Sequence, residues 1–414
     1  MSERPSYLEL LRNRSFGSLW AAQLVSQSGD YIFDVALLWL VLVTTGSTLL
    51  VGLTQAVVVL PQVLAGPIAG VYADRLNRRN IMIASNVVQG LLTAVLSIMY
   101  LEGVLRFPYL LLLVLLLFTA AQFMRASVNA ILPRVVGKGN LGAANGLLSL
   151  TSSANQLVGY ALGGVVIATV GTAGSISYDS FTFFFAAAAL TFVARSFGQV
   201  GEGVSATPAA PAESFWKSFR EGLAFVRSSR VFLELIVFGL IANFFSVGST
   251  AILAPYVRTQ LHGDSVTYGL SLASVALGAI IGSGVIGKVN FRAYVGRLLM
   301  IGIMGFGVLI AMLGLVSSIP LALVVFFFIG VVLGTVNPPI IALMQTKVPN
   351  ELLGRAMTVG MSLLASAQPI AALTFGGLAG VVSLGSLFLG AGASMFVVSV
   401  ALYLPFSELR RASY

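Results

Sequence analysis

The sequence predicts an all-α integral membrane protein with about twelve transmembrane helices in two six-helix bundles. The first observation is composition: of 414 residues, 57% are hydrophobic and only 9% are charged, whereas soluble chains are about a quarter charged. The second is that long apolar runs recur along the whole chain, separated by short polar segments. Because such a chain cannot bury all its apolar surface against itself, lipid has to act as its solvent.

Each apolar run meets the length of about 20 residues that a helix needs to cross a bilayer. A β-barrel would instead need segments of about ten alternating residues, and these runs do not alternate. No short apolar leader with a small-residue cleavage site precedes the first run, so we expect it to be a mature helix. The expected spans are 15–44, 48–73, 81–101, 108–133, 142–170, 179–199, 231–257, 267–287, 297–317, 320–346, 355–381 and 386–406.

The basic residues set the expected orientation. With both termini inside, all but three of the 23 Lys and Arg residues fall on the inner side. The exceptions are Arg106 and Arg258, in outer loops, and Arg125, within a span. This asymmetry favours cytoplasmic termini and an even number of spans. It also accounts for the net charge of +9 without nucleic acid as a partner.

The longest inner loop divides the chain into three parts. We expect an N-terminal six-helix bundle over 1–200, a cytoplasmic linker over 201–230 and a C-terminal six-helix bundle over 231–414. The linker begins with the Gly/Pro/Ala-rich stretch GEGVSATPAAPAE. It continues with SFWKSFREGLAFVRSSR, whose apolar residues Phe215, Trp216, Phe219, Leu223 and Phe225 fall largely on one helical face. This pattern is typical of an amphipathic helix at a membrane surface.

The two halves carry a similar pattern after their second spans. A small residue, a charged residue and an arginine are spaced by four in each half: Gly70, Asp74 and Arg78, then Gly284, Lys288 and Arg292. Duplicated halves around a site in the middle of the bilayer are typical of secondary transporters.

The first of these patterns belongs to a longer motif, Gly70-Val-Tyr-Ala-Asp74-Arg75-Leu-Asn-Arg78-Arg79. It resembles the loop between helices two and three of the major facilitator superfamily, and the resemblance covers the whole chain. The chain looks most similar to the drug-exporting branch with macrolide, tetracycline and siderophore exporters. That resemblance implies two bundles built from 3+3 inverted repeats. Asn77 stands where Gly is usual, and we expect it to adopt the positive φ that Asn tolerates.

The resemblance also implies a conformational gate made of Gly70, Asp74, Arg75, Arg78 and Arg79. In the family, the aspartate accepts hydrogen bonds from a helix N-terminus of the opposite half and pairs with a nearby Arg. Such a lock forms when the transporter faces outward and breaks when it faces inward. The alternative is that this cluster is only a topology signal, which explains the Arg residues but not Asp74 or the glycines.

Two acidic residues, Asp30 and Asp34, lie within the first span, one helical turn apart. An unpaired charged carboxylate at that depth costs at least about 2.5–3.5 kcal/mol, so we expect both to face a cavity and not lipid. Repulsion between them favours retention of one proton. We therefore expect Asp30, Asp34 or the pair to carry a proton inward in exchange for substrate. The alternative is that Asp30 only bonds to neighbours such as Gln27, as part of a structural Ser-x-x-Gly-Asp run.

Arg125 is the basic residue deepest in a span. Helix geometry places it roughly 9 Å from the level of Asp30, too far to assume a salt bridge. It is a possible charge partner in one state, an anion-binding residue, or a snorkelling side chain.

The fifth span carries Gly159, Gly163 and Gly164, which resemble an antiporter motif in which Tyr160 replaces the usual Pro. Small residues at this spacing allow close helix packing. We expect the glycines to seal against proton leak, or simply to pack helices, without the kink that a Pro supports.

Polar and aromatic residues within the spans are candidates for lining a cavity, because buried amides need partners. They are Gln27, Phe33, Gln55, Asn86, Gln89, Asn155, Asn243, Phe244, Asn337 and Gln345. We expect Asn337-Pro338-Pro339 to break its helix. Glu234 and Asp179 are expected at interfaces, near helix ends.

These observations predict a proton-coupled multidrug exporter of amphipathic small molecules, working by alternating access as a functional monomer in a bacterial inner membrane. The alternative is a same-fold exporter of a native substrate such as a siderophore or lysophospholipid. With no Cys and one His, we expect neither a metal site nor an enzyme. No phosphate-binding loop is visible, so we expect no cofactor and assign the energy source to the proton gradient.

Overall fold

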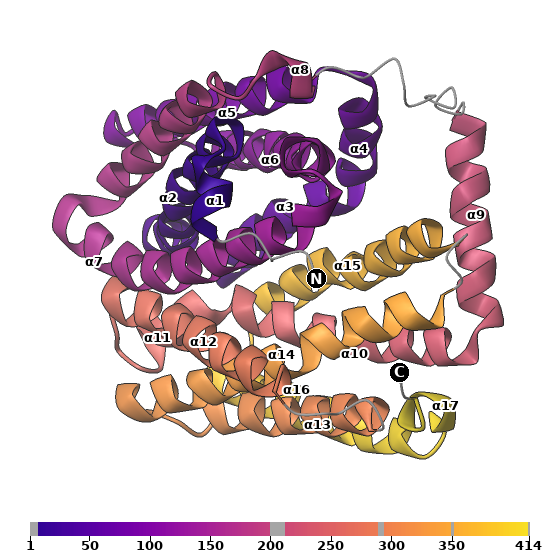
Figure 1. Cartoon of the computed structure of the whole chain (residues 1–414). Coiled ribbons are helices and arrows are strands. Elements are labelled where there is room, and N and C mark those ends of the chain that lie inside the picture. Colours follow the sequence, from indigo (N-terminus) through magenta and orange to yellow (C-terminus); the bar gives the residue numbers. More distant parts are fainter. Residues whose placement is uncertain (1–6, 199–211, 289–293, 349–351, 413–414) are drawn as a thin grey trace. The chain divides into compact units, whose positions relative to one another are not determined.

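The computed structural model describes residues 7–198, 212–288, 294–348 and 352–412, and within these ranges every regular element is a helix (Figure 1). The chain divides into two compact units. Unit 1 comprises Met1–Leu40 and Val57–Ala209, and unit 2 comprises Val41–Ala56 and Ala210–Tyr414. The last residues of α2 and the first half of α3 therefore belong with unit 2. The 201–211 linker and Arg292 of the expected repeat lie outside the described residues.

Unit 1 is coloured indigo to magenta in Figure 1. Its helices, two of which extend into unit 2, are α1 (Tyr7–Arg12), α2 (Arg14–Thr45), α3 (Thr48–Leu64), α4 (Gly66–Arg75), α5 (Arg78–Leu101), α6 (Phe107–Val136), the 3₁₀ turn η1 (Lys138–Asn140), α7 (Leu141–Leu190) and α8 (Arg195–Gly198). Unit 2 contains α9 (Ala212–Ser228), α10 (Arg230–Ala251), α11 (Leu253–Thr259), α12 (Ser265–Ile286), α13 (Val295–Leu313), α14 (Ile319–Lys347), α15 (Leu353–Leu378), α16 (Leu384–Tyr403) and α17 (Ser407–Arg410).

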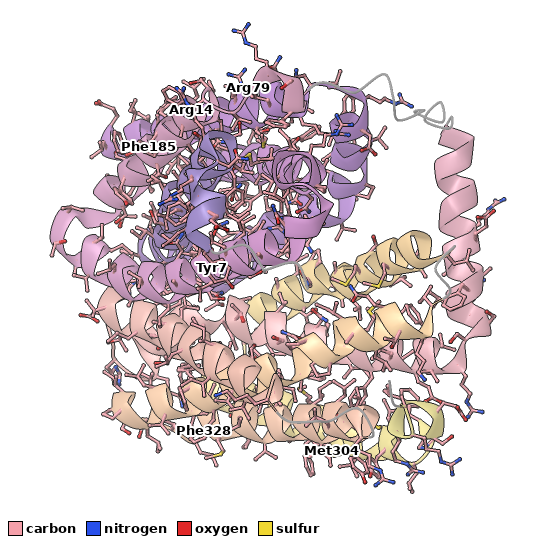
Figure 2. All side chains as sticks on the ribbon, in the orientation of Figure 1. Tyr7, Arg14, Arg79, Phe185, Met304 and Phe328 are labelled. Atoms are coloured by element: carbon pink, nitrogen blue, oxygen red, sulfur yellow. The ribbon has the colours of Figure 1, made fainter. Side chains whose placement is uncertain are left out.

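Ten helices of the described chain are long and apolar enough to cross a membrane, or eleven when α3 and α4, bent by 43°, count as one span. Large apolar side chains cover their outer faces: Phe185 of unit 1 and Phe328 of unit 2 point outward and are exposed (Figure 2). Lipid is the solvent in which such a surface is stable. The expectation of an all-α integral membrane protein is therefore confirmed.

Helix α7 consists of two arms, 141–170 and 172–190, joined at Gly171. Gly171 has φ 76° and ψ 171°, a conformation that glycine adopts without steric penalty because it has no Cβ. The turn is a single residue, so the second arm begins well before residue 179. The expected start of that span was wrong, and Asp179 lies inside the helix instead of at its outer boundary.

Within unit 2, α12 and α14 approach each other backbone to backbone. Gly278 and Gly282 of α12 lie against Gly330 and Gly334 of α14: a Cβ on Gly278 would come within 3.0 Å of the Gly330 Cα, and one on Gly334 within 2.8 Å of the Ala279 Cα. Each helix thus carries a Gly-x-x-x-Gly pair at the interface, a spacing that allows membrane helices to pack closely.

The expectation that Asn337-Pro338-Pro339 breaks its helix was wrong, because α14 runs through both prolines. Pro338 lacks an N–H, so the carbonyl of Gly334 loses its intrahelical donor. The Ser283 hydroxyl of α12 donates to this carbonyl at 3.1 Å. The close approach of α12 therefore supplies the hydrogen bond that the proline removes, which lets the helix continue.

Glu234 lies near the start of α10, as expected, and its side chain is buried within unit 2. Its Oε2 accepts the backbone N–H of Leu409 at 2.7 Å, and its Oε1 accepts from Arg230 Nε at 3.2 Å. The short helix α17 is thereby tied to α10. A carboxylate at this position is stable because donors satisfy both oxygens.

Helix α9 covers the second part of the expected amphipathic segment. Near its end, Val226 is buried and the Phe225 ring lies 5.7 Å from the ring of Phe232. This end of its apolar face therefore packs within unit 2. The side chains of Phe215, Trp216 and Phe219 lie outside the described ones.

Asp264 begins α12 as its N-cap, and its side chain accepts the Thr267 N–H at 2.9 Å and the Thr267 hydroxyl at 3.0 Å. The bond from the Thr267 N–H is the main cause that holds the Asp264 pKa below its usual value. The ionised Asp264 cap therefore stabilises the folded state fully above the unfolded-state pKa of Asp264. This stabilisation is lost as the pH falls through the lower folded-state pKa.

We expect Asp264→Ala to lower the stability of unit 2 by about 0.5–2 kcal/mol, the usual range for loss of a helix cap. Asp264→Asn is the matched control, because Asn caps helices as well as Asp. Thermal unfolding of the purified variants in detergent checks this. Equal melting temperatures for Asp264→Ala and the wild type would contradict it.

Candidate functional site

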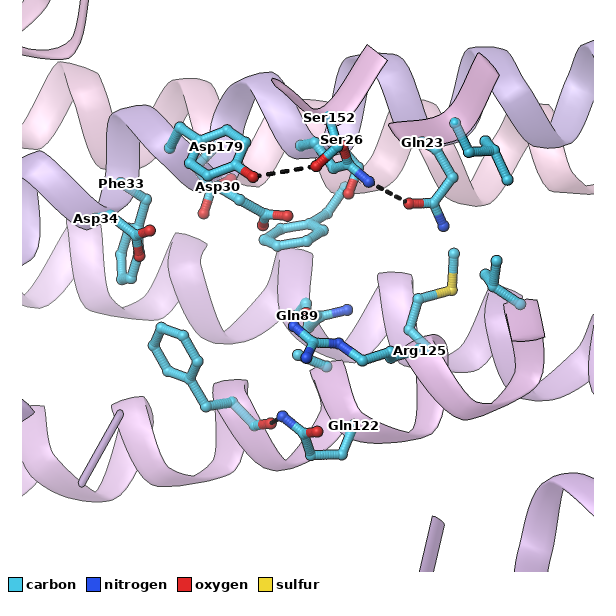
Figure 3. A pocket seen from close by; sticks show the side chains of 18 of the residues that line it. Gln23, Ser26, Asp30, Phe33, Asp34, Gln89, Gln122, Arg125, Ser152 and Asp179 are labelled. Carbon is cyan, nitrogen blue, oxygen red and sulfur yellow. Dashed lines mark hydrogen bonds between the residues drawn. The ribbon is translucent and has the colours of Figure 1, made fainter. Parts of the chain in front are cut away.

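A cavity of about 470 Å³ lies inside unit 1, lined by residues of α2, α5, α6 and α7 (Figure 3). Its charged side chains are Asp30 and Asp34 of α2, Asp179 of α7 and Arg125 of α6. The lining therefore carries three carboxylates and one guanidinium. In a helical membrane protein, charged side chains within the spans mark ion or substrate pathways.

Helix α2 presents a polar stripe to this cavity. Gln23, Gln27, Asp30 and Asp34 recur at spacings of three or four residues, so they share one helical face. Gln27 Nε2 donates to Gln23 Oε1 at 2.9 Å (Figure 3), and the Gln27 Oε1 is buried without a hydrogen-bond partner in the described chain. The stripe thus leads to the two aspartates and retains capacity for further hydrogen bonds.

Arg125 lies across the cavity from the α2 stripe (Figure 3). Among the described residues, no ion pair within 4.0 Å links it to an aspartate. A guanidinium held apart from several carboxylates in one cavity leaves room for a ligand or water between them.

The first arm of α7 packs against α2 through its glycines. A Cβ on Gly159 would lie 2.7 Å from the Tyr31 Cβ, and one on Gly163 would lie 3.3 Å from the Ile32 Cα. Gly164 is also buried. Tyr160 places its ring edge-on to that of Tyr31, with ring centroids 5.1 Å apart. This close packing positions the segment of α2 that carries Asp30 and Asp34.

Of the other expected lining residues, Gln27, Phe33 and Gln89 line the cavity. Asn86 and Asn155 do not. Asn86 Nδ2 donates to the Met82 carbonyl, one turn earlier in its own helix, and Asn155 Nδ2 donates to the Leu24 carbonyl of α2. The amide nitrogens of both residues thus donate to the backbone, whereas the Asn86 Oδ1 is buried without a hydrogen-bond partner in the described chain.

The remaining expected residues lie in unit 2. Asn243 Oδ1 accepts from Gln368 Nε2 at 3.2 Å, and the Phe244 ring lies 5.8 Å from that of Phe375. Gln55 is half-buried in α3, whereas Asn337 and Gln345 of α14 are exposed.

The loop between α4 and α5 carries the Gly70–Arg79 motif. Asp74 is 73% exposed and its Oδ1 lies 3.8 Å from Arg78 Nη2. Arg78 Nε donates to the Ala73 carbonyl, and Arg79 Nη2 donates to the Thr191 carbonyl beyond the end of α7. Gly70 lies one turn before Asp74 with open space where a Cβ would stand, and Arg75 ends α4.

The expected positive φ at Asn77 was wrong. Its φ is −64° and its side chain accepts the Asn80 N–H as the N-cap of α5. Asn replaces Gly here because its side chain caps the next helix, a role that Asn fills as well as any residue.

Sequence reasoning missed Asp179 and several polar residues of the wall, among them Gln23, Gln122, Asn129, Asn145 and Ser152. The signal for Asp179 was an acidic residue directly before the apolar run 181–190. For Gln23 it was the spacing of four from Gln27.

A helical bundle with many membrane spans and a charged, polar cavity within one unit defines an integral membrane transporter. The chain belongs to the transmembrane secretion effector family of the major facilitator superfamily, whose sequence profile matches residues 6–412. The family and its relatives are transporters and not enzymes.

Three relatives illustrate this membership. The multidrug efflux pump Tap of Mycolicibacterium fortuitum is 27% identical over 393 residues, covering 93% of this chain and 94% of Tap. Macrolide efflux protein A of Streptococcus pyogenes is 24% identical, covering 96% of each chain. The enterobactin exporter EntS of Shigella boydii is 25% identical, covering 98% of this chain and 95% of EntS.

Solved structures share the fold. A bacterial homologue of the iron transporter ferroportin, in an inward-facing state, aligns with TM-score 0.73 at 18% identity over 96% of this chain and 99% of that one. A D-xylose–proton symporter aligns with TM-score 0.70 at 14% identity over 98% and 100%.

Proposed function

We propose that this protein is a proton-coupled exporter of amphipathic, cationic small molecules. The observation that carries this proposal is the cavity of unit 1, in which Asp30 and Asp34 stand on one face of α2. When ionised, these carboxylates attract a cation, and a proton taken up by the acids of the cavity weakens that attraction. Exchange of a proton for the substrate at one site would couple inward proton flow to export. The efflux relatives support the direction of transport.

The proposal includes the topology that such a cycle requires. Ten helices are long enough to span, and the bent α3–α4 pair makes an eleventh span. Counting the two arms of α7 as separate spans brings the number to twelve. We place these in two six-helix bundles of 3+3 inverted repeats, with both termini in the cytoplasm and the chain in a bacterial inner membrane as a monomer. Alternating access then moves one bundle against the other around the site.

The direct test is transport by the purified protein in proteoliposomes with an imposed pH gradient, screened over cationic dyes, macrolides and tetracyclines. We expect saturable uptake of at least one cationic compound that collapses when a protonophore removes the gradient. Uptake that persists without a proton gradient but follows a sodium gradient would contradict proton coupling.

A second candidate is export of a native substrate such as a siderophore or lysophospholipid. Two observations favour it: Arg125 offers a guanidinium to an anionic group in the cavity, and one relative is an enterobactin exporter. Competition of such an anion with a cationic dye, lost in Arg125→Gln, would favour this alternative.

We also propose that the Gly70–Arg79 loop gates the inner side, with Asp74 as its acceptor. The high exposure of Asp74 leaves its carboxylate available to donors that only one state supplies. We expect Asp74→Asn to slow transport by about tenfold or more, because loss of a hydrogen bond to a charged group costs about 1.5–3 kcal/mol. Substrate affinity should not change.

Transport rates and equilibrium dye binding, measured on the same preparations, check this prediction. Glu408→Gln, an exposed acid of α17, is the control and should leave the rate unchanged. Wild-type rates for Asp74→Asn would show that the loop acts only as a topology signal.

A further inference from the structure

We propose that Asp179 holds the proton that this cavity exchanges, while Asp30 and Asp34 face the substrate cation. The inference rests on the proposed proton-coupled function and assigns its two ligands to different carboxylates of one cluster. It follows from the enclosure of Asp179, from its packing against Gly29, and from the charges around the cavity.

Asp179 is the most enclosed carboxylate of the cavity. It is 0% exposed, whereas Asp30 and Asp34 are only partly buried. Its Oδ2 is buried without a hydrogen-bond partner in the described chain. Its Oδ1 lies 3.4 Å from the Thr182 hydroxyl, but that hydroxyl also lies 2.8 Å from the Asp179 carbonyl, to which its one proton is better placed to donate. A naked carboxylate is unstable in such surroundings, whereas a protonated one is not.

Gly29 makes the space for this side chain. A Cβ on Gly29 would lie 2.5 Å from Asp179 Oδ1 and 3.2 Å from the Asp179 Cα. The glycine immediately precedes Asp30, so it brings Asp179 beside the acidic stripe of α2 (Figure 3). The Ser26-x-x-Gly29-Asp30 run thereby gains a physical reason: its glycine admits the carboxylate of α7, and its aspartate faces the cavity.

The charged and titratable groups around Asp179 are few. From α2 these are Asp30, Asp34 and Tyr31, and from α6 the group is Arg125 across the cavity. The neighbouring α5 contributes only the neutral amide of Gln89 to the lining, and Tyr178 precedes Asp179 on α7. Asp30, Asp34 and Asp179 line one cavity, so their negative charges repel one another when all three are ionised.

These groups define the exchange. When Asp30, Asp34 and Asp179 are all ionised, three negative charges face the one positive charge of Arg125, so the cluster has an excess of two negative charges. Either one proton on Asp179 or one monovalent cation at Asp30 and Asp34 lowers this excess to one negative charge, so each of the two makes the other less favourable. When the cation leaves outward, the proton enters from outside onto Asp179; when the proton leaves inward, a new cation binds. Each cycle thus moves one proton against one cation, with no other reactant.

The test measures ethidium affinity of the purified protein as a function of pH. For the wild type we expect affinity to rise with pH, by up to about tenfold per pH unit, the limit for release of one proton on binding. Asp179→Asn should bind ethidium with the weak affinity that the wild type shows at low pH, and without pH dependence. Asp30→Asn and Asp34→Asn should bind more weakly at every pH but keep the slope.

Three further results complete the design. Asp179→Asn should retain ethidium exchange across proteoliposomes while losing transport driven by a pH gradient. Thr182→Val removes the neighbouring hydroxyl but keeps the carboxyl, so it should keep the slope; loss of the slope there would show that packing and not the carboxyl carries it. A slope that persists in Asp179→Asn and vanishes in Asp30→Asn or Asp34→Asn would overturn the assignment, while leaving proton coupling intact. A wild type without any slope would instead overturn the proposed function itself.

Discussion

Replacing Asp30 and Asp34 together by asparagine is expected to abolish both ethidium binding and transport driven by a pH gradient. The two residues share one face of α2 and line the cavity of unit 1. Asparagine keeps the size and the hydrogen-bonding capacity of each side chain but removes the negative charge that attracts a cation. Each single variant should retain part of the binding, since one carboxylate of the pair remains.

The measurement is dye uptake into proteoliposomes at matched protein density, with binding measured on the same preparations. Glu102→Gln is the control, because this exposed acid between α5 and α6 lies outside the cavity. Its activity should equal that of the wild type. If the double variant still concentrates dye in response to a pH gradient, the cavity acids do not bind the substrate.

The same substitution at two glycines of α12 is expected to change stability in opposite directions. Gly278→Ala would place a methyl group 2.8 Å from the Val331 nitrogen and 3.0 Å from the Gly330 Cα of α14. Such overpacking against rigid backbone costs about 1–3 kcal/mol. At Gly284 nothing lies within 4 Å, so Gly284→Ala should stabilise the helix by up to about 1 kcal/mol through its higher helix propensity.

Melting temperatures of the two variants in the same detergent decide this prediction. Gly278→Ala should melt below the wild type, and Gly284→Ala at or above it. Comparable melting temperatures for both variants would mean that α12 and α14 do not pack through their glycines.

The fold class was predictable because it depends on a property of the whole chain, namely the length and composition of its apolar runs. The boundaries were less so. A single residue, Gly171, turns α7 back on itself, and the apolar runs on either side gave no sign that the loop was so short. As a result Asp179 was expected at an outer boundary and not in the cavity wall.

Individual side chains were predicted where local geometry sets their position. Asp30 and Asp34 line one cavity because residues four apart share a helical face. Asn86 and Asn155 were not predictable in this way. A buried amide can bond to the backbone or line a wet cavity, and only the packing of α5, α6 and α7 decides between these outcomes.

Backbone partners explain the other differences. Pro338 was expected to break α14, but the Ser283 hydroxyl of a neighbouring helix replaces the lost donor. Glu234 was expected near a helix end, and the burial of its carboxylate there depends on the Leu409 N–H, far along the chain. Both partners come from long-range packing that local sequence patterns do not encode.

The most direct test of the account is whether the purified wild-type protein releases protons when it binds a cationic substrate. Ethidium added to the protein in weakly buffered detergent solution, with a pH indicator present, measures this. The account predicts acidification that saturates with substrate at one proton per bound cation. Saturable binding with no release of protons at any pH would contradict it, because proton and cation would then not exchange in the acidic cavity.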